Sequence, residues 1–222
     1  MKLWNEFYDF VMPHVPGVDT AMVDFHLRET AIEFYERSQA WRYVHAPITV
    51  TALTANYPYV TPDAAQTEVH VINYAEFNDD EIGSQTSQFS SRYKDWRNLI
   101  SQPEFVIGSQ TEAILVPIPS LDGTLDLIVS LKPTVDSTGI DEDLQFDDYR
   151  ATMVHGALYR LMRIPAKPYT SQELAYAHMV DFSAGITAAN IRVELEYTNA
   201  PLETGLRTIK RMENRRRINR DF

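Results

Sequence analysis

The sequence predicts an α+β protein: a helical bundle formed by N- and C-terminal helices, an inserted antiparallel β domain and an extended C-terminal tail. Apolar residues recur every three or four positions near both ends of the chain and alternate with a period of two between them. The last sixteen residues, "RTIKRMENRRRINRDF", hold seven Lys or Arg. We therefore expect the bundle in residues 1–45 and 134–200, the β domain in 46–133 and a basic tail in 201–222.

The amino-acid composition excludes several classes of function. The chain has 222 residues, of which 44% are hydrophobic, which is enough for a packed core. It has no cysteine, so disulfide scaffolds, thiolate metal sites and cysteine nucleophiles are excluded, and we expect synthesis in a reducing cytoplasm. No apolar run reaches the length of a membrane span, and Glu6 and Asp9 interrupt any signal peptide. We expect a soluble protein with no membrane partner.

The first long helix is expected between Val18 and Trp41, with Asp19 as its N-cap. Two apolar stripes run along it, so the helix should be covered on two sides, and another subunit is one possible cover. The stripes are Val18, Met22, Phe25 and Ile32, and Val23, Leu27, Phe34 and Trp41. The aromatic residues before this helix (Trp4, Phe7, Tyr8 and Phe10) are expected either in the core or in a subunit interface.

The alternating region predicts strands, of which "TLDLIVSLKP" is the strongest, with Leu125, Leu127, Val129 and Leu131 on one face. Asp122-Gly123 predicts a hairpin that joins this strand to "EAILVPIP", residues 112–119. The prolines in the latter strand cannot donate ladder hydrogen bonds, so we expect it to lie at an edge or to end early. Residues 78–98 are expected to form a long loop with one short helix around Tyr93 to Trp96.

Two helices are expected in the last third of the chain. The first runs from Asp143 to Arg163, with Phe146, Tyr149, Met153, Ala157 and Leu161 on its apolar face. Thr170 and Glu173 predict a capping box for the second, which continues to about Tyr197. Its apolar row is Ala175, Met179, Phe182, Ile186, Ala189 and Val193. A second row, made mostly of small residues, is expected beside the first and should allow another helix to approach closely. It consists of Leu174, Ala177, Ala184, Ala188, Ile191 and Leu195.

Residue patterns for catalysis are weak. The six histidines (His14, His26, His45, His70, His155 and His178) show none of the short spacings typical of metal sites, so we expect no metal and no cofactor. The acidic residues Asp141, Glu142, Asp143, Asp147 and Asp148, with His155, offer one hydrolase alternative. Helix capping and the helix dipole explain these acids equally well. Phosphate-binding and dinucleotide-binding loops are absent from the sequence, so we expect no enzyme and no catalytic residue.

Three segments of the chain are distinctive: "ERSQAWR", "VSLKPTVDSTGI" and "DDYRATMVHGALYRLMRIPAKPYTSQELAYAHMVDFSAGITAA". They resemble the head-to-tail adaptor proteins of tailed bacteriophages, the connector or tail-tubular family. The most specific part pairs the helix of Tyr149, Gly156, Ala157 and Leu158 with a linker and the start of the next helix. Those parts hold Pro165, Lys167, Pro168, Tyr169, Glu173, Leu174 and Ala175. The resemblance covers roughly residues 18–54 and 125–196.

The resemblance implies a structural virion protein at the head-tail junction, made in the host cytoplasm. Such adaptors form a homo-oligomeric ring, usually of twelve copies, under the portal protein. The ring binds a downstream tail or nozzle protein, and double-stranded DNA passes through its bore without specific binding. Neighbouring subunits would cover the second apolar stripes, and an acidic body would keep moving DNA from adhering. The alternative from a different class is a small nucleic-acid-binding protein that uses the basic C-terminal arm.

The basic tail contrasts with the rest of the chain. Residues 201–222 carry seven basic and three acidic groups, which is a net charge of +4. Because the whole chain has a formal net charge of −11, residues 1–200 carry −15. A solvated terminus, a DNA contact and docking on a partner are the three interpretations, and the apolar residues among the cations favour a protein partner. By position, the resemblance assigns the tail to the portal. The predicted portal-binding residues are Arg207, Ile209, Lys210, Arg211, Met212, Arg215, Arg216, Arg217, Ile218 and Arg220.

Overall fold

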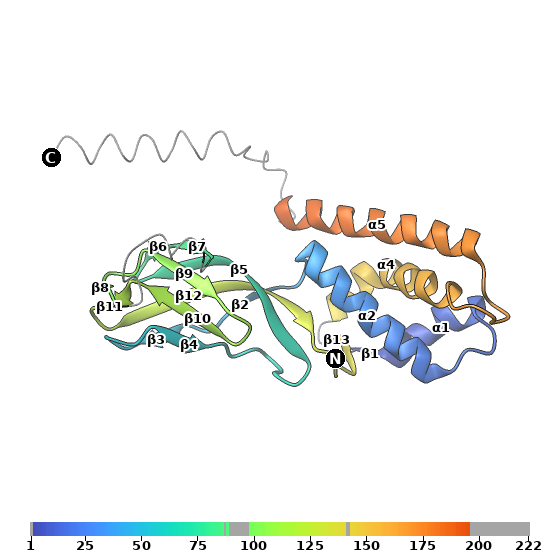
Figure 1. Ribbon diagram of the computed structural model, residues 1–222, viewed down its shortest axis with the longest axis horizontal. Coiled ribbons are helices and arrows are strands. Elements are labelled where there is room, and N and C mark those ends of the chain that lie inside the picture. Colours follow the sequence, from blue (N-terminus) through green and yellow to red (C-terminus); the bar gives the residue numbers. More distant parts are fainter. Residues whose placement is uncertain (1, 87, 89–97, 141–142, 196–222) are drawn as a thin grey trace.

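The computed structural model describes residues 2–86, 88, 98–140 and 143–195. The protein combines helices with sheets, and the helices gather at one end of the molecule while most strands gather at the other (Figure 1). The predicted α+β class is therefore confirmed. The predicted tail and the predicted short helix from Tyr93 to Trp96 lie outside the described residues, and the domain boundaries stay a prediction.

The N-terminal part forms a series of short elements and one long helix. The short elements are β1 (Lys2–Leu3), η1 (Trp4–Phe7), α1 (Tyr8–Val11) and η2 (Met12–His14), and α2 follows as Thr20–Ser38. As predicted, Asp19 caps α2, because its carboxylate accepts a hydrogen bond from the Ala21 amide at 3.0 Å. Gln39, at φ 51°, ends the helix in a left-handed conformation. Trp4 and Phe7 are buried in the core, whereas Phe10 is exposed.

The C-terminal helices are α4 (Asp143–Met162) and α5 (Gln172–Leu195), which form a helical hairpin. Helix α4 contacts both α2 and α5. The predicted cap of α5 is wrong by one residue: Ser171 Oγ accepts from the Leu174 amide at 3.3 Å. Thr170 is occupied within the linker, where its hydroxyl donates to the Ile164 carbonyl and accepts from the Lys167 amide.

Strands from distant parts of the chain pair in two main sheets. The larger sheet has the order β2-β12-β5-β6, with β3 on the same edge of β12 as β2. Its strands are β2 (Arg42–Val44), β3 (Ile48–Val50), β5 (Thr67–Phe77), β6 (Asp80–Glu81) and β12 (Gly123–Pro133). The smaller sheet has the order β4-β10-β9-β7. Its strands are β4 (Asn56–Pro58), β7 (Gly83–Gln85), β9 (Phe105–Gly108) and β10 (Glu112–Val116).

Two further pairs of short strands complete the β structure. The strand pairing corrects two predictions. Strand β1 pairs with β13 (Gly139–Ile140), and β8 (Ile100–Ser101) pairs with β11 (Ile118–Pro119). The β7–β9 and β8–β11 pairs are parallel, so the β region is not wholly antiparallel. Residues 78–98, predicted as a loop, contribute β6 and β7.

The predicted hairpin through Asp122-Gly123 is also wrong. Strand β10 pairs with β4 and β9, whereas β12 pairs with β2, β3 and β5. Strand β10 ends at Val116 because Pro117 and Pro119 follow and lack amide donors, so the early end was correctly predicted. The chain then passes between the sheets, and the Asp122 carboxylate accepts from the Ala52 amide at 2.7 Å.

One continuous core joins helices and sheets. The predicted inner face of β12 is fully buried, with Leu125, Leu127, Val129 and Leu131 in the same cluster as residues of α2, α4 and α5. Lys132 adds a polar link, because its Nζ lies 2.6 Å from a Glu36 oxygen on α2 and 3.2 Å from a Glu68 oxygen on β5. Burial alone lowers the pKa of Lys132, but the two carboxylates outweigh it and raise that pKa.

Helix α4 is packed most tightly at Gly156. A Cβ added there would lie 2.3 Å from Thr30 Cγ2 on α2 and 2.9 Å from the Phe182 ring on α5. Thr30 and Phe182 are both buried, so neither has space into which it can move. Gly156 therefore sets the distance between three helices.

We predict that Gly156→Ala destabilises the protein. Alanine gains about 1 kcal/mol in helix propensity, but overpacking a filled core costs about 1–3 kcal/mol. The net loss should lower the midpoint of chemical denaturation followed by circular dichroism. Gly83→Ala is the matched control, because a Cβ at Gly83 meets no atom within 4 Å. Equal midpoints for the two variants would contradict the packing argument.

Candidate interaction surface on the helices

Helix α5 buries one side against the rest of the helices. Ala175, Phe182, Ile186 and Ala189, from the predicted apolar row, are buried. Met179 and Val193 of the same row are partly exposed. The row repeats at steps of three and four, so it follows one side of the helix and meets α4 and α2. This part of the prediction is confirmed.

The opposite side of α5 carries a second set of apolar and small residues, which we call the outer row. It consists of Leu174, Ala177, Ala184, Ala188 and Ile191, all of them exposed. The sequence predicted that this row lies beside the buried row. At 100° per residue the two rows instead lie on opposite sides of α5, so packing against α4 does not cover the outer row. Val180 is exposed at its border and enlarges the apolar surface.

Helix α2 shows the same division. Its stripe of Val23, Leu27 and Phe34 is buried, whereas Met22 and Phe25 of the other stripe are 38% and 46% exposed. Large apolar residues in such positions are more informative when they align than when they are scattered. Helices α2 and α5 thus each present an apolar side that the subunit does not cover.

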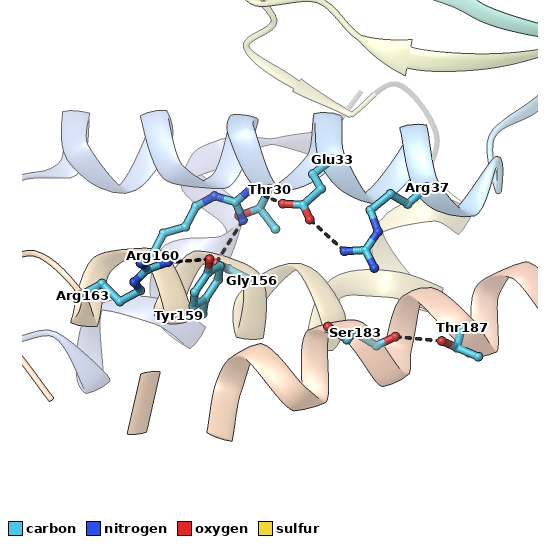
Figure 2. A network of polar contacts seen from close by, with 9 residues as sticks. All are labelled: Thr30, Glu33, Arg37, Gly156, Tyr159, Arg160, Arg163, Ser183 and Thr187. Atoms are coloured by element: carbon cyan, nitrogen blue, oxygen red, sulfur yellow. Dashed lines mark hydrogen bonds and ion pairs between the residues drawn. The ribbon is translucent and has the colours of Figure 1, made fainter. Parts of the chain in front are cut away.

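A polar network holds α2 on α4 (Figure 2). Arg160 on α4 donates from Nη1 to Thr30 Oγ1 at 3.0 Å and from Nη2 to Glu33 Oε2. Glu33 Oε1 also accepts from Arg37 Nη1 at 2.8 Å. The Arg160 side chain is 19% exposed and that of Arg37 is 50% exposed. The buried member of the network should therefore contribute most of its stability.

A second polar cluster joins α4 to α5. His155 Nδ1 lies 2.8 Å from His178 Nδ1 and 3.6 Å from Asp181 Oδ2. Burial lowers the pKa of His178, the neighbouring His155 and His14 lower it further, and Asp181 opposes them. In the sequence these histidines are isolated, with none of the short spacings typical of metal sites. One signal was missed: His155 lies eleven residues before Ala166 in the linker and His178 lies twelve residues after it, so the two are side by side when the helices fold into a hairpin.

The structure does not assemble the hydrolase alternative from the residues that it describes. Asp148 forms an ion pair with Arg192 on α5 at 3.1 Å. His155 faces His178 and Asp181, which are not among the acids considered for that site. Within the described part of the chain, none of the helices combines the length and apolar character needed to cross a bilayer.

A comparison with protein-family models identifies the family of the chain. A model of the SU10 adaptor protein family matches residues 15–205. The chain belongs to this family. The resemblance to phage head-to-tail adaptors is thereby confirmed, and the match includes the middle region that the resemblance left out. No curated protein matches the chain. The SU10 adaptors are structural phage proteins and not a family of enzymes.

The predicted portal-binding residues of this SU10 adaptor lie outside the described residues and stay a prediction. They are Arg207, Ile209, Lys210, Arg211, Met212, Arg215, Arg216, Arg217, Ile218 and Arg220. The surface that the structure itself reveals is different. It is the outer row of α5, for which the sequence supplied the residues but the wrong side of the helix.

In this adaptor, Arg160→Met should destabilise the fold more than Arg37→Met. Both changes remove a partner of Glu33, but only Arg160 is largely buried and joins two helices. We expect a loss of about 1.5–3 kcal/mol in the free energy of unfolding for Arg160→Met and about 0.3–0.5 kcal/mol for the exposed pair. Urea denaturation of both variants measures the difference. Similar losses would mean that the network does not connect α2 to α4 energetically.

Proposed function

We propose that this chain is a head-to-tail adaptor that forms a homo-oligomeric ring between the portal protein and the tail. The family match over residues 15–205 supports an adaptor role, and the exposed outer row of α5 supports assembly through that helix. A ring of twelve copies follows from the resemblance. Its place is the neck of the virion, its partners are the portal and a downstream tail or nozzle protein, and its synthesis takes place in the host cytoplasm.

The outer row has the chemistry of a contact between copies. Three of its five residues are alanines, which let a neighbouring backbone approach closely, and Leu174 and Ile191 add apolar area near the two ends. In a ring, each subunit has two different neighbours, so contact surfaces on both sides are required. We assign the outer row to one neighbour and the exposed Met22 and Phe25 of α2 to the other.

The charge of the protein fits the passage of DNA through such a ring. The formal net charge is −11, and residues 1–200 together carry −15. Negative charge repels a duplex and leaves it free to move, because binding to DNA relies on neutralised phosphates. The basic residues are concentrated at the C-terminus, where we place the contact with the portal.

We predict that purified portal recruits many copies of this chain and that the outer row is required. Light scattering of the complex measures the added mass, and negative-stain images show whether a ring lies under the portal. One or two copies per portal assembly would refute the ring. Binding of the isolated chain to DNA that weakens steeply with salt would favour the nucleic-acid-binding alternative.

Ala188→Arg tests the contact surface in the same assay. The substitution adds a long charged side chain to the outer row, where its burial against a neighbour is costly, so recruitment should fall to a few copies per portal. Asn190→Arg is the matched control, because Asn190 is exposed on the same helix but is not part of the row. Unchanged melting temperatures for both variants are required for the comparison. Full recruitment of Ala188→Arg would exclude the outer row from the interface.

We further predict that the basic tail anchors the adaptor to the portal. Truncation after Thr204 removes all ten predicted portal-binding residues. Each exposed ion pair contributes only about 0–1 kcal/mol, but loss of the segment from every copy multiplies the effect. Pull-down on portal particles at two salt concentrations should show a large loss of binding, with an unchanged melting temperature. Undiminished binding would exclude the anchor, and a collapsed melting temperature would assign the tail to the core.

A further inference from the structure

We propose that His155, His178 and Asp181 form a binding site for a divalent transition metal, of the Zn²⁺ class, at the seam between α4 and α5. Asp181 lies between Ala177 and Ala184 along the outer row, whereas the two histidines do not belong to that row, and nothing in the adaptor role requires a metal. The three side chains are the group of possible metal ligands that the described residues bring together. Their ligand atoms all lie within 4.8 Å of one another.

The helical hairpin positions these ligands. His178 and Asp181 are three residues apart on α5 and therefore point from neighbouring positions on one side of the helix. His155 reaches them from α4, and its ring centroid lies 5.0 Å from that of His178. Rings on two different helices thus converge on one point.

The distances fit a zinc ion after a small adjustment. Two ligand atoms at about 2.0–2.1 Å from a tetrahedral Zn²⁺ lie about 3.3 Å from each other. The distance between the two Nδ1 atoms is 2.8 Å, and that from His155 Nδ1 to the carboxylate is 3.6 Å. One value is about 0.5 Å shorter and the other about 0.3 Å longer than the ideal, so small side-chain rotations bring these two pairs to the separation that Zn²⁺ requires. Water would complete the tetrahedron.

The contact between the His155 and His178 rings also determines where their protons lie. Two Nδ1 atoms at 2.8 Å form a hydrogen bond in which one ring donates and the other accepts. To bind a metal, both rings must present lone pairs at Nδ1. The donor ring therefore transfers its proton to Nε2, by exchange with water, and both rings remain neutral. Metal binding then requires no net loss of a proton at neutral pH.

The donor set selects the kind of metal. Two imidazoles and one carboxylate suit Zn²⁺, Co²⁺ or Ni²⁺, whereas Ca²⁺ and Mg²⁺ prefer oxygen ligands alone. The site is also open to metal from solution, because the side chains of His155 and Asp181 are 34% and 58% exposed. A bound ion would cross-link α4 and α5 and so stabilise the helix that carries the outer row.

The test uses the untagged full-length protein, since a histidine tag would itself bind metal. Titration with Co²⁺ should give visible absorption bands of a low-symmetry site that saturate at one ion per chain. Zn²⁺ should displace Co²⁺ and raise the melting temperature, and chelation should reverse the rise. Mg²⁺ and Ca²⁺ should have no such effect. Binding that needs millimolar Zn²⁺ would overturn the proposal.

Variants connect the signal to the three residues. His178→Gln should weaken binding of Zn²⁺ at least about tenfold, which corresponds to about 1.4 kcal/mol. Asp181→Asn should do the same and preserves shape at an exposed position, so it keeps the test valid if His178→Gln fails to fold. His70→Gln is the matched control, because His70 contacts the Glu36 carbonyl and lies on β5. Equal affinity in all variants would overturn the site.

The pH dependence of metal binding provides an independent readout. The charged and titratable groups around His178 are His155 on α4, His14 on η2 and Asp181 on α5. Protonated imidazole rings cannot bind a metal, so the metal-dependent rise in melting temperature should diminish as the pH falls and the rings take up protons. A rise of the same size at every pH would contradict imidazole ligation. Every measurement uses the isolated chain, so its failure would leave the adaptor proposal unaffected.

Discussion

The close packing of α4 between α2 and α5 determines the other features of the helical region. At Gly156 the helices approach until no Cβ fits, and at Gly185 the Thr152 side chain of α4 imposes the same limit. This spacing brings Arg160 within reach of Thr30 and Glu33, and it brings His155 level with His178. It also fixes which side of α5 is buried, and therefore which side is left for a neighbour.

Local patterns in the sequence predicted the elements better than their pairing. The cap of α2 follows from the residue types at its start, and the buried rows of the helices and the inner face of β12 follow from periods of 3.6 and 2. The predicted hairpin at Asp122-Gly123 relied on a turn signal alone. Strand β12 instead pairs with the distant β5, from Leu125 with Phe77 to Pro133 with Thr67, because pairing depends on which faces can be buried together. Such choices are non-local and leave little trace in a short window.

The candidate sites show the same limit. The residues of the outer row were visible in the sequence, but their side of α5 depended on which row α4 and α2 cover. The cluster of His155, His178 and Asp181 escaped a search for short spacings, because its members come from two helices. The predicted portal contacts rest on charge and position alone. Charge and position single out a segment, but they do not determine the geometry of its contacts with a partner.

Strand β12 determines how the molecule responds to a pulling force. It is paired with β5 from Leu125 to Pro133, and it ends near Lys132, which is bound to α2. A force that pulls the helices away from the sheets would act along β12, parallel to the strands. The ladder hydrogen bonds lie across that direction, so they would be strained together in shear and not opened one after another. The connection between the two ends of the molecule is therefore built to resist extension.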